Sequence, residues 1–335
     1  KKPHQIHNQM ATPTTKNLVP PHHSPTTNTI QTLAHPQNPQ RNKRRTKMKI
    51  IHIFHHYWPV VGGLENAIKA IAEEQARLGH EVHVITSTYG AQGRPREETI
   101  NGVHIHRIKA IRPGYPDLTL PLEHPDILKE ADAVLVYSHN SLFNYSMAKY
   151  IKRLNKALLT TYFIGVNYLK NHYNPIIKTI GYKYEKYVTK EFAKMTDIAL
   201  TVNKCEAEIL KNNYGINSVI IPHGIHESFI NKPYEGDLFR RKYGIQGEII
   251  TYLGRLHPTK GVDLLIKAFS IIRKPNNDIY LVIAGSGPRT YVNYLYKVTS
   301  RLGLSKYVHF LGYISEADKV GLIDASKFLV LPTKH

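Results

Sequence analysis

The sequence predicts an α/β protein built from two doubly wound, Rossmann-like domains, the second of them incomplete. The chain has 335 residues, which is enough for two domains of ordinary size. From Met48 onward, short runs rich in β-branched residues alternate with longer stretches of helical periodicity. This alternation is typical of parallel sheets that helices cover on both faces.

The first domain is predicted at residues 48–222. Its first strand is expected at 49–54, and a helix follows Gly62 and Gly63 until Gly79, which we expect to end it in the left-handed conformation. A lysine-bearing helix is expected at 176–194. Further strands are expected at 81–87, 102–110, 131–139, 156–163, 197–203 and 218–224, with a proline-containing loop at 112–125.

The second domain is predicted at 248–335, after a polar linker at 223–247. Strands are expected at 248–254, 279–285, 307–313 and 328–332, and helices at 261–273, 289–302 and 315–325. The sequence ends at His335, directly after the last of these strands, whereas a doubly wound sheet normally continues. We therefore expect this domain to be truncated.

Charge and composition limit the classes of partner. The formal net charge is +20, from 45 basic and 25 acidic residues, which favours an anionic partner such as nucleic acid, acidic lipid or a phosphorylated ligand. Residues 1–47 hold eight Lys or Arg and no Asp or Glu among many polar residues, so we predict a disordered basic tail. One cysteine, Cys205, excludes an internal disulfide, and no apolar run approaches the roughly 20 residues of a membrane span. We expect a cytoplasmic protein.

The loop GRLHPTKG, residues 254–261, is the strongest candidate for a phosphate site. It joins an expected strand to an expected helix, so Arg255, Lys260 and the helix N-terminus meet at the carboxyl edge of a sheet, where doubly wound domains bind phosphates. Together the two cations can neutralise a diphosphate leaving group without a metal ion. A solvated turn with a helix cap is the alternative interpretation.

Two glycine-containing loops follow other strands in the same way. Gly62 and Gly63 leave room for backbone N–H groups to approach an anionic or sugar oxygen. Their spacing is not G-x-G-x-x-G, which disfavours a dinucleotide site and hydride chemistry. Gly285 and Gly287, in AGSGP, repeat the geometry in the second half, with a proline helix start as the alternative.

His139, in YSHNSLF, follows a buried strand at the same edge. A histidine there can hydrogen-bond a sugar hydroxyl, shuttle a proton, or only cap the end of the strand. The carboxylates give no metal pattern, because no Asp-x-Asp occurs and Glu206 and Glu208 would point to different faces of a helix. The sequence therefore predicts no metal site.

Several motifs together resemble the retaining glycosyltransferases of family 4, which have the GT-B fold. The likeness extends from about Met48 to the last residue. It is carried by HHYWPVVGGLENAIKAIAEEQARLGHEVHVIT, IPHGIHESF, GRLHPTKGVDLLIKAF, LVIAGSGP and FLVLPT, in this order. The Gly-Arg-Leu-x(4)-Lys-Gly pattern is the most specific of them.

The resemblance implies transfer of a hexosyl group from a nucleoside-diphosphate sugar to a hydroxyl of a glycolipid or polysaccharide, with retention and without a metal or other cofactor. It assigns the donor diphosphate to Arg255 and Lys260. It places the loop of Gly62 and Gly63 between donor and acceptor, and it assigns Gly285 and Gly287 to a loop of the donor domain. His139 would be a catalytic residue near the transferred sugar. The resemblance further implies cell envelope polysaccharide biosynthesis. From the charge of the first domain and the lysine-bearing helix at 176–194, we expect a peripheral location on an acidic membrane surface, at the inner membrane face.

The family places two glutamates, separated by seven residues, after the LPT motif, and only Lys334 and His335 remain here. We therefore expect the chain as given to be inactive. Two other functions stay open: a non-hydrolysing nucleotide-sugar epimerase on the same architecture, and a basic nucleic-acid-binding protein. An assay for hydroxyl transfer against epimer formation separates the transferase from the epimerase. The nucleic-acid function is disfavoured because basic patches interleaved with aromatic residues are missing.

Overall fold

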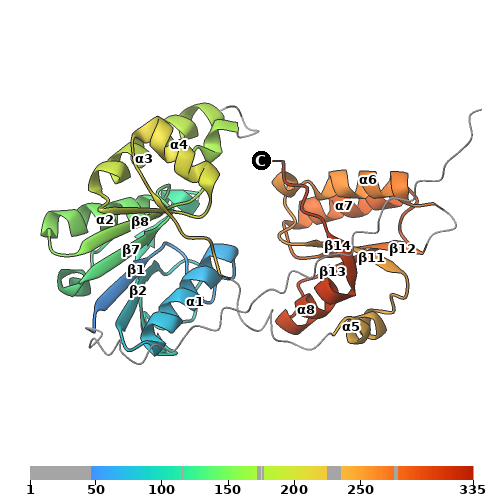
Figure 1. Ribbon diagram of the computed structural model, residues 1–335, viewed down its shortest axis with the longest axis horizontal. Coiled ribbons are helices and arrows are strands. Elements are labelled where there is room, and N and C mark those ends of the chain that lie inside the picture. The colour runs from blue at the N-terminus through green and yellow to red at the C-terminus, as the bar shows by residue number, and fades with distance from the viewer. Residues whose placement is uncertain are drawn as a thin grey trace, which may run out of the picture. The chain divides into compact units, whose positions relative to one another are not determined.

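The computed structural model describes residues 47–114, 116–171, 175, 177–224, 235–274 and 278–334. The predicted tail, apart from Lys47, and residues 225–234 of the predicted linker lie outside these described residues. The described part of the chain forms two α/β domains, each with a parallel sheet between helices (Figure 1). The predicted fold class is thus confirmed.

The first domain contains the following elements. They are β1 (Lys49–Ile53), α1 (Gly63–Arg77), β2 (Glu81–Ser87), β3 (Glu97–Ile100), β4 (Val103–Ile108), β5 (Ala110–Ile111), η1 (Pro116–Leu118), β6 (Leu120–Pro121), η2 (Asp126–Glu130), β7 (Ala133–Tyr137), α2 (Leu142–Leu154), β8 (Leu158–Phe163), η3 (Tyr168–Asn171), η4 (Ile177–Gly181), α3 (Tyr182–Met195), β9 (Ile198–Thr201), α4 (Lys204–Tyr214) and β10 (Val219–Ile220).

Its sheet has the strand order β10-β9-β8-β7-β1-β2-β4-β3. All neighbouring strands are parallel except β3, which pairs antiparallel with β4 at the edge. Helix α1 covers one face through Ile68 and Ala72, whereas α2, α3 and α4 pack on the other face, around Phe143 and Phe192 (Figure 1). Since Ile53 pairs with Val136, the carboxyl ends of β1 and β7 lie side by side.

Most of these elements were predictable from short sequence patterns. Helix α1 ends before Gly79, which has φ +94° as predicted. The expected lysine-bearing helix is two elements, because a π-helical turn, η4, precedes α3, and Ile176 lies outside the described residues. The edge strand β3 was not predicted, because its sequence EETI is mostly polar and half exposed.

The second domain contains α5 (Gly236–Tyr243), β11 (Glu248–Leu253), η6 (Pro258–Lys260), α6 (Val262–Ile272), β12 (Ile279–Ala284), α7 (Arg289–Arg301), β13 (Val308–Gly312), α8 (Glu316–Ala325) and β14 (Ser326–Leu329). The strands form a parallel sheet in the order β13-β12-β11-β14. Helices α6 and α7 cover one face of it, and α5 and α8 cover the other (Figure 1).

Two boundaries in this domain need correction. Helix α5 lies inside the segment predicted as linker, where Phe239 is 2% exposed and packs with Leu322 of α8. Arg240 fixes α5 further, since its guanidinium donates to the carbonyl of Ala325 at 2.6 Å. The last strand begins at Ser326, earlier than predicted, because α8 passes directly into β14.

No helix of the described part has the length and apolarity needed to cross a bilayer.

Candidate functional site

Arg255 and Lys260 follow the carboxyl end of β11, as the sequence predicts. The chain turns through Gly254, and η6 begins after His257, whose ring accepts from the backbone N–H of Thr259. Gly261, at φ +65°, then leads into α6. This strand, loop and helix arrangement brings both cations to the edge where parallel α/β sheets bind ligands.

Neither of these two cations forms an ion pair with a described residue. Arg255 is exposed and Lys260 is half-buried. The carbonyl of Arg255 accepts from the hydroxyl of Tyr252 at 2.8 Å, which fixes the backbone while the guanidinium stays available. Two positive charges on one loop, with no ion-pair partner among the described residues of the second domain, favour an anion with more than one negative charge.

Gly285 and Gly287 allow a close approach, but of one loop to the next. A Cβ on Gly285 would lie 1.8 Å from the carbonyl oxygen of Gly254, and a Cβ on Gly287 would lie 1.9 Å from that of Leu256. The backbone N–H of Leu256 donates to the carbonyl of Ser286 at 2.8 Å in the same contact. These glycines therefore let the loop after β12 support the loop that carries Arg255.

Gly62 and Gly63 stand at the start of α1, after β1, where the sequence predicts an open loop. A Cβ on Gly63 would meet nothing within 4 Å. A Cβ on Gly62 would lie 2.1 Å from a carboxylate oxygen of Glu65, whose side chain folds back over the helix start. Burial raises the pKa of Glu65. The reasoning from sequence missed this residue, although acidic residues are favoured in the first turn of a helix.

His139 follows β7 and is fully buried. Neither of its ring nitrogens has a hydrogen-bond partner among the described residues, and its ring lies 5.3 Å from that of Phe163 between centroids. Burial lowers the pKa of His139 to about 3. The imidazole is therefore neutral near pH 7, which suits a hydrogen bond to a hydroxyl better than proton shuttling.

Arg107, on β4, is a second residue that the reasoning from sequence missed. It is 1% exposed and forms an ion pair with Glu98. Its guanidinium also donates to the carbonyls of Pro95 and Trp58, both at 2.9 Å. Because the carbonyl of Trp58 belongs to the loop that leads to Gly62, Arg107 anchors that loop. The position of this arginine inside an apolar strand pattern could have indicated from the sequence that its side chain is buried.

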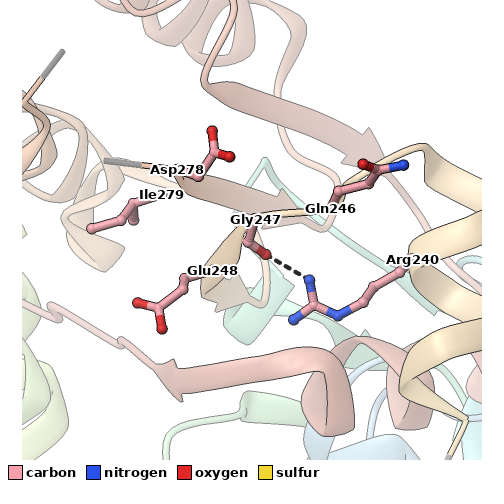
Figure 2. Close-up of a pocket in the computed structure, with 6 residues that line it drawn as sticks. All are labelled: Arg240, Gln246, Gly247, Glu248, Asp278 and Ile279. Carbon is pink, nitrogen blue, oxygen red and sulfur yellow. Dashed lines mark hydrogen bonds between the residues drawn. The ribbon is translucent and has the colours of Figure 1, made fainter. Parts of the chain in front are cut away.

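A separate shallow cavity of about 460 Å³ lies at the amino ends of β11 and β12 (Figure 2). Arg240 and Asp278 are among its lining residues, and the Arg240 guanidinium is engaged by the carbonyl of Gly247 at 2.6 Å (Figure 2). The cavity lies at the sheet edge opposite to Arg255 and does not include any predicted site residue. Across the described ranges, no group of three His, Cys, Asp or Glu side chains is placed to hold a metal ion.

The two Rossmann-like domains have the architecture of the GT-B class of glycosyltransferases. The sequence profile described as Glycosyltransferase Family 4 matches residues 61–229, and the profile described as Glycosyl transferases group 1 matches residues 237–335. The chain therefore belongs to the family 4 glycosyltransferases of group 1, and it is a transferase enzyme. This confirms the resemblance stated from the motifs.

Curated relatives and solved structures agree with this assignment. The chain is 29% identical to the uncharacterized glycosyltransferase MJ1607 of Methanocaldococcus jannaschii over 86% of its own length and 75% of that protein. It is 25% identical to the phosphatidylinositol N-acetylglucosaminyltransferase GPI3 subunit of Saccharomyces cerevisiae, over 77% of the chain but only 57% of that protein. The fold is similar to that of sucrose-phosphate synthase from Thermosynechococcus elongatus, with TM-score 0.69, 16% identity, and coverage of 86% of this chain and 76% of that one.

Proposed function

We propose that the protein transfers a hexosyl group from a nucleoside-diphosphate sugar to a hydroxyl of a glycolipid or saccharide, with retention of the anomeric configuration. The observation that carries the proposal is the pair Arg255 and Lys260, two cations at the carboxyl edge of the second sheet that have no ion-pair partner among the described residues of their own domain. Family membership supports the sugar transfer, and the cation pair supports a diphosphate as the leaving group.

The leaving diphosphate gains negative charge as the glycosidic bond breaks. In the proposed function, the guanidinium of Arg255 binds two phosphate oxygens and the ammonium of Lys260 adds a third contact, so their charges stabilise the leaving group most strongly in the transition state. This supply of positive charge makes a metal ion unnecessary, and we propose that the transfer needs no metal and no other cofactor.

The first domain contributes contacts to the sugar and the acceptor in this proposal. His139, neutral because of burial, forms a hydrogen bond with a hydroxyl of the transferred sugar. The backbone N–H groups at Gly62 and Gly63 face a sugar oxygen. The carboxylate of Glu65 lies over Gly62, which favours a neutral hydroxyl there over a phosphate.

We propose that the enzyme binds an acidic membrane surface and reaches a glycolipid acceptor there. We further propose that it acts at the inner membrane face in cell envelope polysaccharide biosynthesis. Helix α3 supports this: Lys183, Lys186 and Lys190 are exposed along one side, next to Tyr187, which is 59% exposed, while Val188 and Phe192 face the core. Each lysine near an anionic surface contributes about 1 kcal/mol. The name of the phosphatidylinositol-acting yeast relative is consistent with a lipid acceptor.

The donor proposal is tested with a full-length version of the protein and a panel of UDP-glucose, UDP-N-acetylglucosamine, ADP-glucose and GDP-mannose. We expect Lys260→Ala to lower kcat about 100- to 1000-fold with the preferred donor, the usual effect of removing one preorganised charge contact. The exposed Lys267→Ala, on α6, is the matched control and should keep wild-type turnover. Unchanged turnover in Lys260→Ala would refute the diphosphate site, and an inverted anomeric centre in the product NMR spectrum would refute retention.

The membrane proposal is tested by sedimentation with vesicles at low salt. Replacement of Lys183, Lys186 and Lys190 by Gln should abolish most binding to vesicles that contain phosphatidylserine. A variant with Gln at the exposed Lys267, Lys297 and Lys306 of the second domain has the same net charge and should bind normally. Equal binding of the wild type to neutral and anionic vesicles would remove the proposal.

A further inference from the structure

The turn that carries His139 is strained. Ser138, the preceding residue, has φ +72°, a left-handed conformation that is unfavourable for a residue with a Cβ. His139 is fully buried, and neither of its ring nitrogens has a hydrogen-bond partner in the described part of the chain. Since hydrogen bonds do not orient the imidazole there, the course of the backbone through Ser138 decides where the ring lies.

Asn144, in the first turn of α2, is the side chain that reaches this backbone. It is fully buried, and its Nδ2 donates to the carbonyl of Tyr137 at 2.5 Å and to the carbonyl of Ser138 at 2.8 Å. These are the carbonyls on either side of the left-handed backbone step. A side-chain amide carries two N–H donors on one nitrogen, whereas a hydroxyl carries one donor and a carboxylate carries none. Asparagine is therefore a residue type that can donate to both carbonyls from one nitrogen.

We propose that Asn144 is a positioning residue for the transfer reaction. Its amide holds Ser138 in the left-handed conformation, and this conformation places the imidazole of His139 at the carboxyl edge of β7. The inference rests on the proposed contact between His139 and the transferred sugar. It goes beyond that contact by naming what keeps the histidine in place.

A buried amide can also stabilise a fold without affecting the reaction, and the two roles have different consequences. A stabilising residue changes the unfolding temperature and leaves the turnover of the folded enzyme unchanged. A positioning residue lowers kcat at temperatures where the variant is fully folded and leaves KM nearly constant, because small displacements at a reacting centre mainly affect the transition state.

The test uses the full-length version of the protein and the donor of the four-sugar panel that the wild type consumes fastest. We expect Asn144→Ala and Asn144→Asp to lower kcat about tenfold or more, with KM within about twofold of wild type. Met147→Ala is the matched control, because Met147 lies on the same helix, is fully buried and packs in the apolar core through a side chain that has no N–H donor. It should lower the unfolding temperature and keep kcat.

A second substitution separates positioning from packing. Glycine adopts positive φ without steric cost, so Ser138→Gly in the Asn144→Ala background should make the amide dispensable and recover kcat about fivefold or more. Lost core packing would not be repaired by a glycine in the turn. A double variant no more active than Asn144→Ala would overturn the inference.

The remaining outcomes distinguish this inference from the proposed function. Wild-type turnover in His139→Ala would overturn the proposed role of His139 and the positioning role with it. A large loss in His139→Ala together with wild-type kcat in Asn144→Ala would overturn the positioning role alone. A crystal structure of Asn144→Ala in which Ser138 and His139 have not moved would overturn it without any activity measurement.

Discussion

His52 makes the stability of the first domain depend on pH, and the size of this effect follows from its contacts. The residue lies on the central strand β1 and is fully buried. Its Nε2 is 2.7 Å from Oε1 of Gln75, which only accepts, so Nε2 carries the proton. Its Nδ1, 2.9 Å from the hydroxyl of Tyr137, accepts. The ring is therefore neutral, and burial lowers its pKa from 6.5 to about 4.

Proton linkage gives the direction in which the free energy of unfolding changes with pH. Between pH 6.5 and pH 4 the unfolded chain binds a proton at this residue and the folded chain does not, so the contribution of His52 is complete above pH 6.5 and is lost as the pH falls towards 4. One pH unit corresponds to about 1.4 kcal/mol. Acidification from pH 7.5 to 5.0 should thus reduce the free energy of unfolding by about 2 kcal/mol through His52 alone.

The assay is urea unfolding followed by the fluorescence of Trp58, the one tryptophan of the chain, which reports on the first domain. His52→Gln removes the titration, so the difference in unfolding free energy between pH 7.5 and 5.0 should shrink by about 2 kcal/mol. His124→Gln, at an exposed position, should leave the difference unchanged. An equal pH dependence in His52→Gln and wild type would refute the reasoning.

Three further predictions concern the metal, a glycine and a buried arginine. Transfer should persist in EDTA, and complete loss of activity that added divalent ions restore would contradict the proposal. Gly287→Ala should destabilise the second domain by about 1–3 kcal/mol in calorimetry, because the new Cβ overlaps a neighbouring carbonyl, whereas Gly224→Ala, where a Cβ meets nothing within 4 Å, should not. Arg107→Leu should cost about 3–5 kcal/mol in urea unfolding by leaving Glu98 without its buried partner. Arg94→Leu removes an exposed partner of the same carboxylate and should cost less than about 1 kcal/mol, and equal losses in both variants would argue against the anchor.

The parts of the fold that sequence could predict are those with local causes. Buried parallel strands consist of runs of apolar residues, so the bounds of β1, β2 and β11 were predicted to within a few residues. The placement of Arg255 and His139 also followed, because any residue directly after a parallel strand lies at the carboxyl edge.

The parts that were missed depend on distant residues. Helix α5 carries little apolar surface of its own, and Phe239 is buried only because α8, far along the chain, covers it. Strand β3 exists because β4 pairs with it. The burial of Arg107 is likewise a tertiary effect that spacing and composition do not encode, and so is the lack of a hydrogen-bond partner for His139 among the described residues.

The loop of Arg255 and Lys260 owes its shape to segments far away in the chain. The loop after β12 accepts a hydrogen bond from Leu256, and the segment after β14 donates one from Lys334 to the carbonyl of Thr259. Contacts between such distant segments form late in folding, since each requires a long loop to close. During synthesis the loop of Arg255 and Lys260 should therefore lack its folded conformation until the segment after β14 has been made. In the proposed function, nucleotide sugars then have no formed diphosphate site on the growing chain before that segment is made.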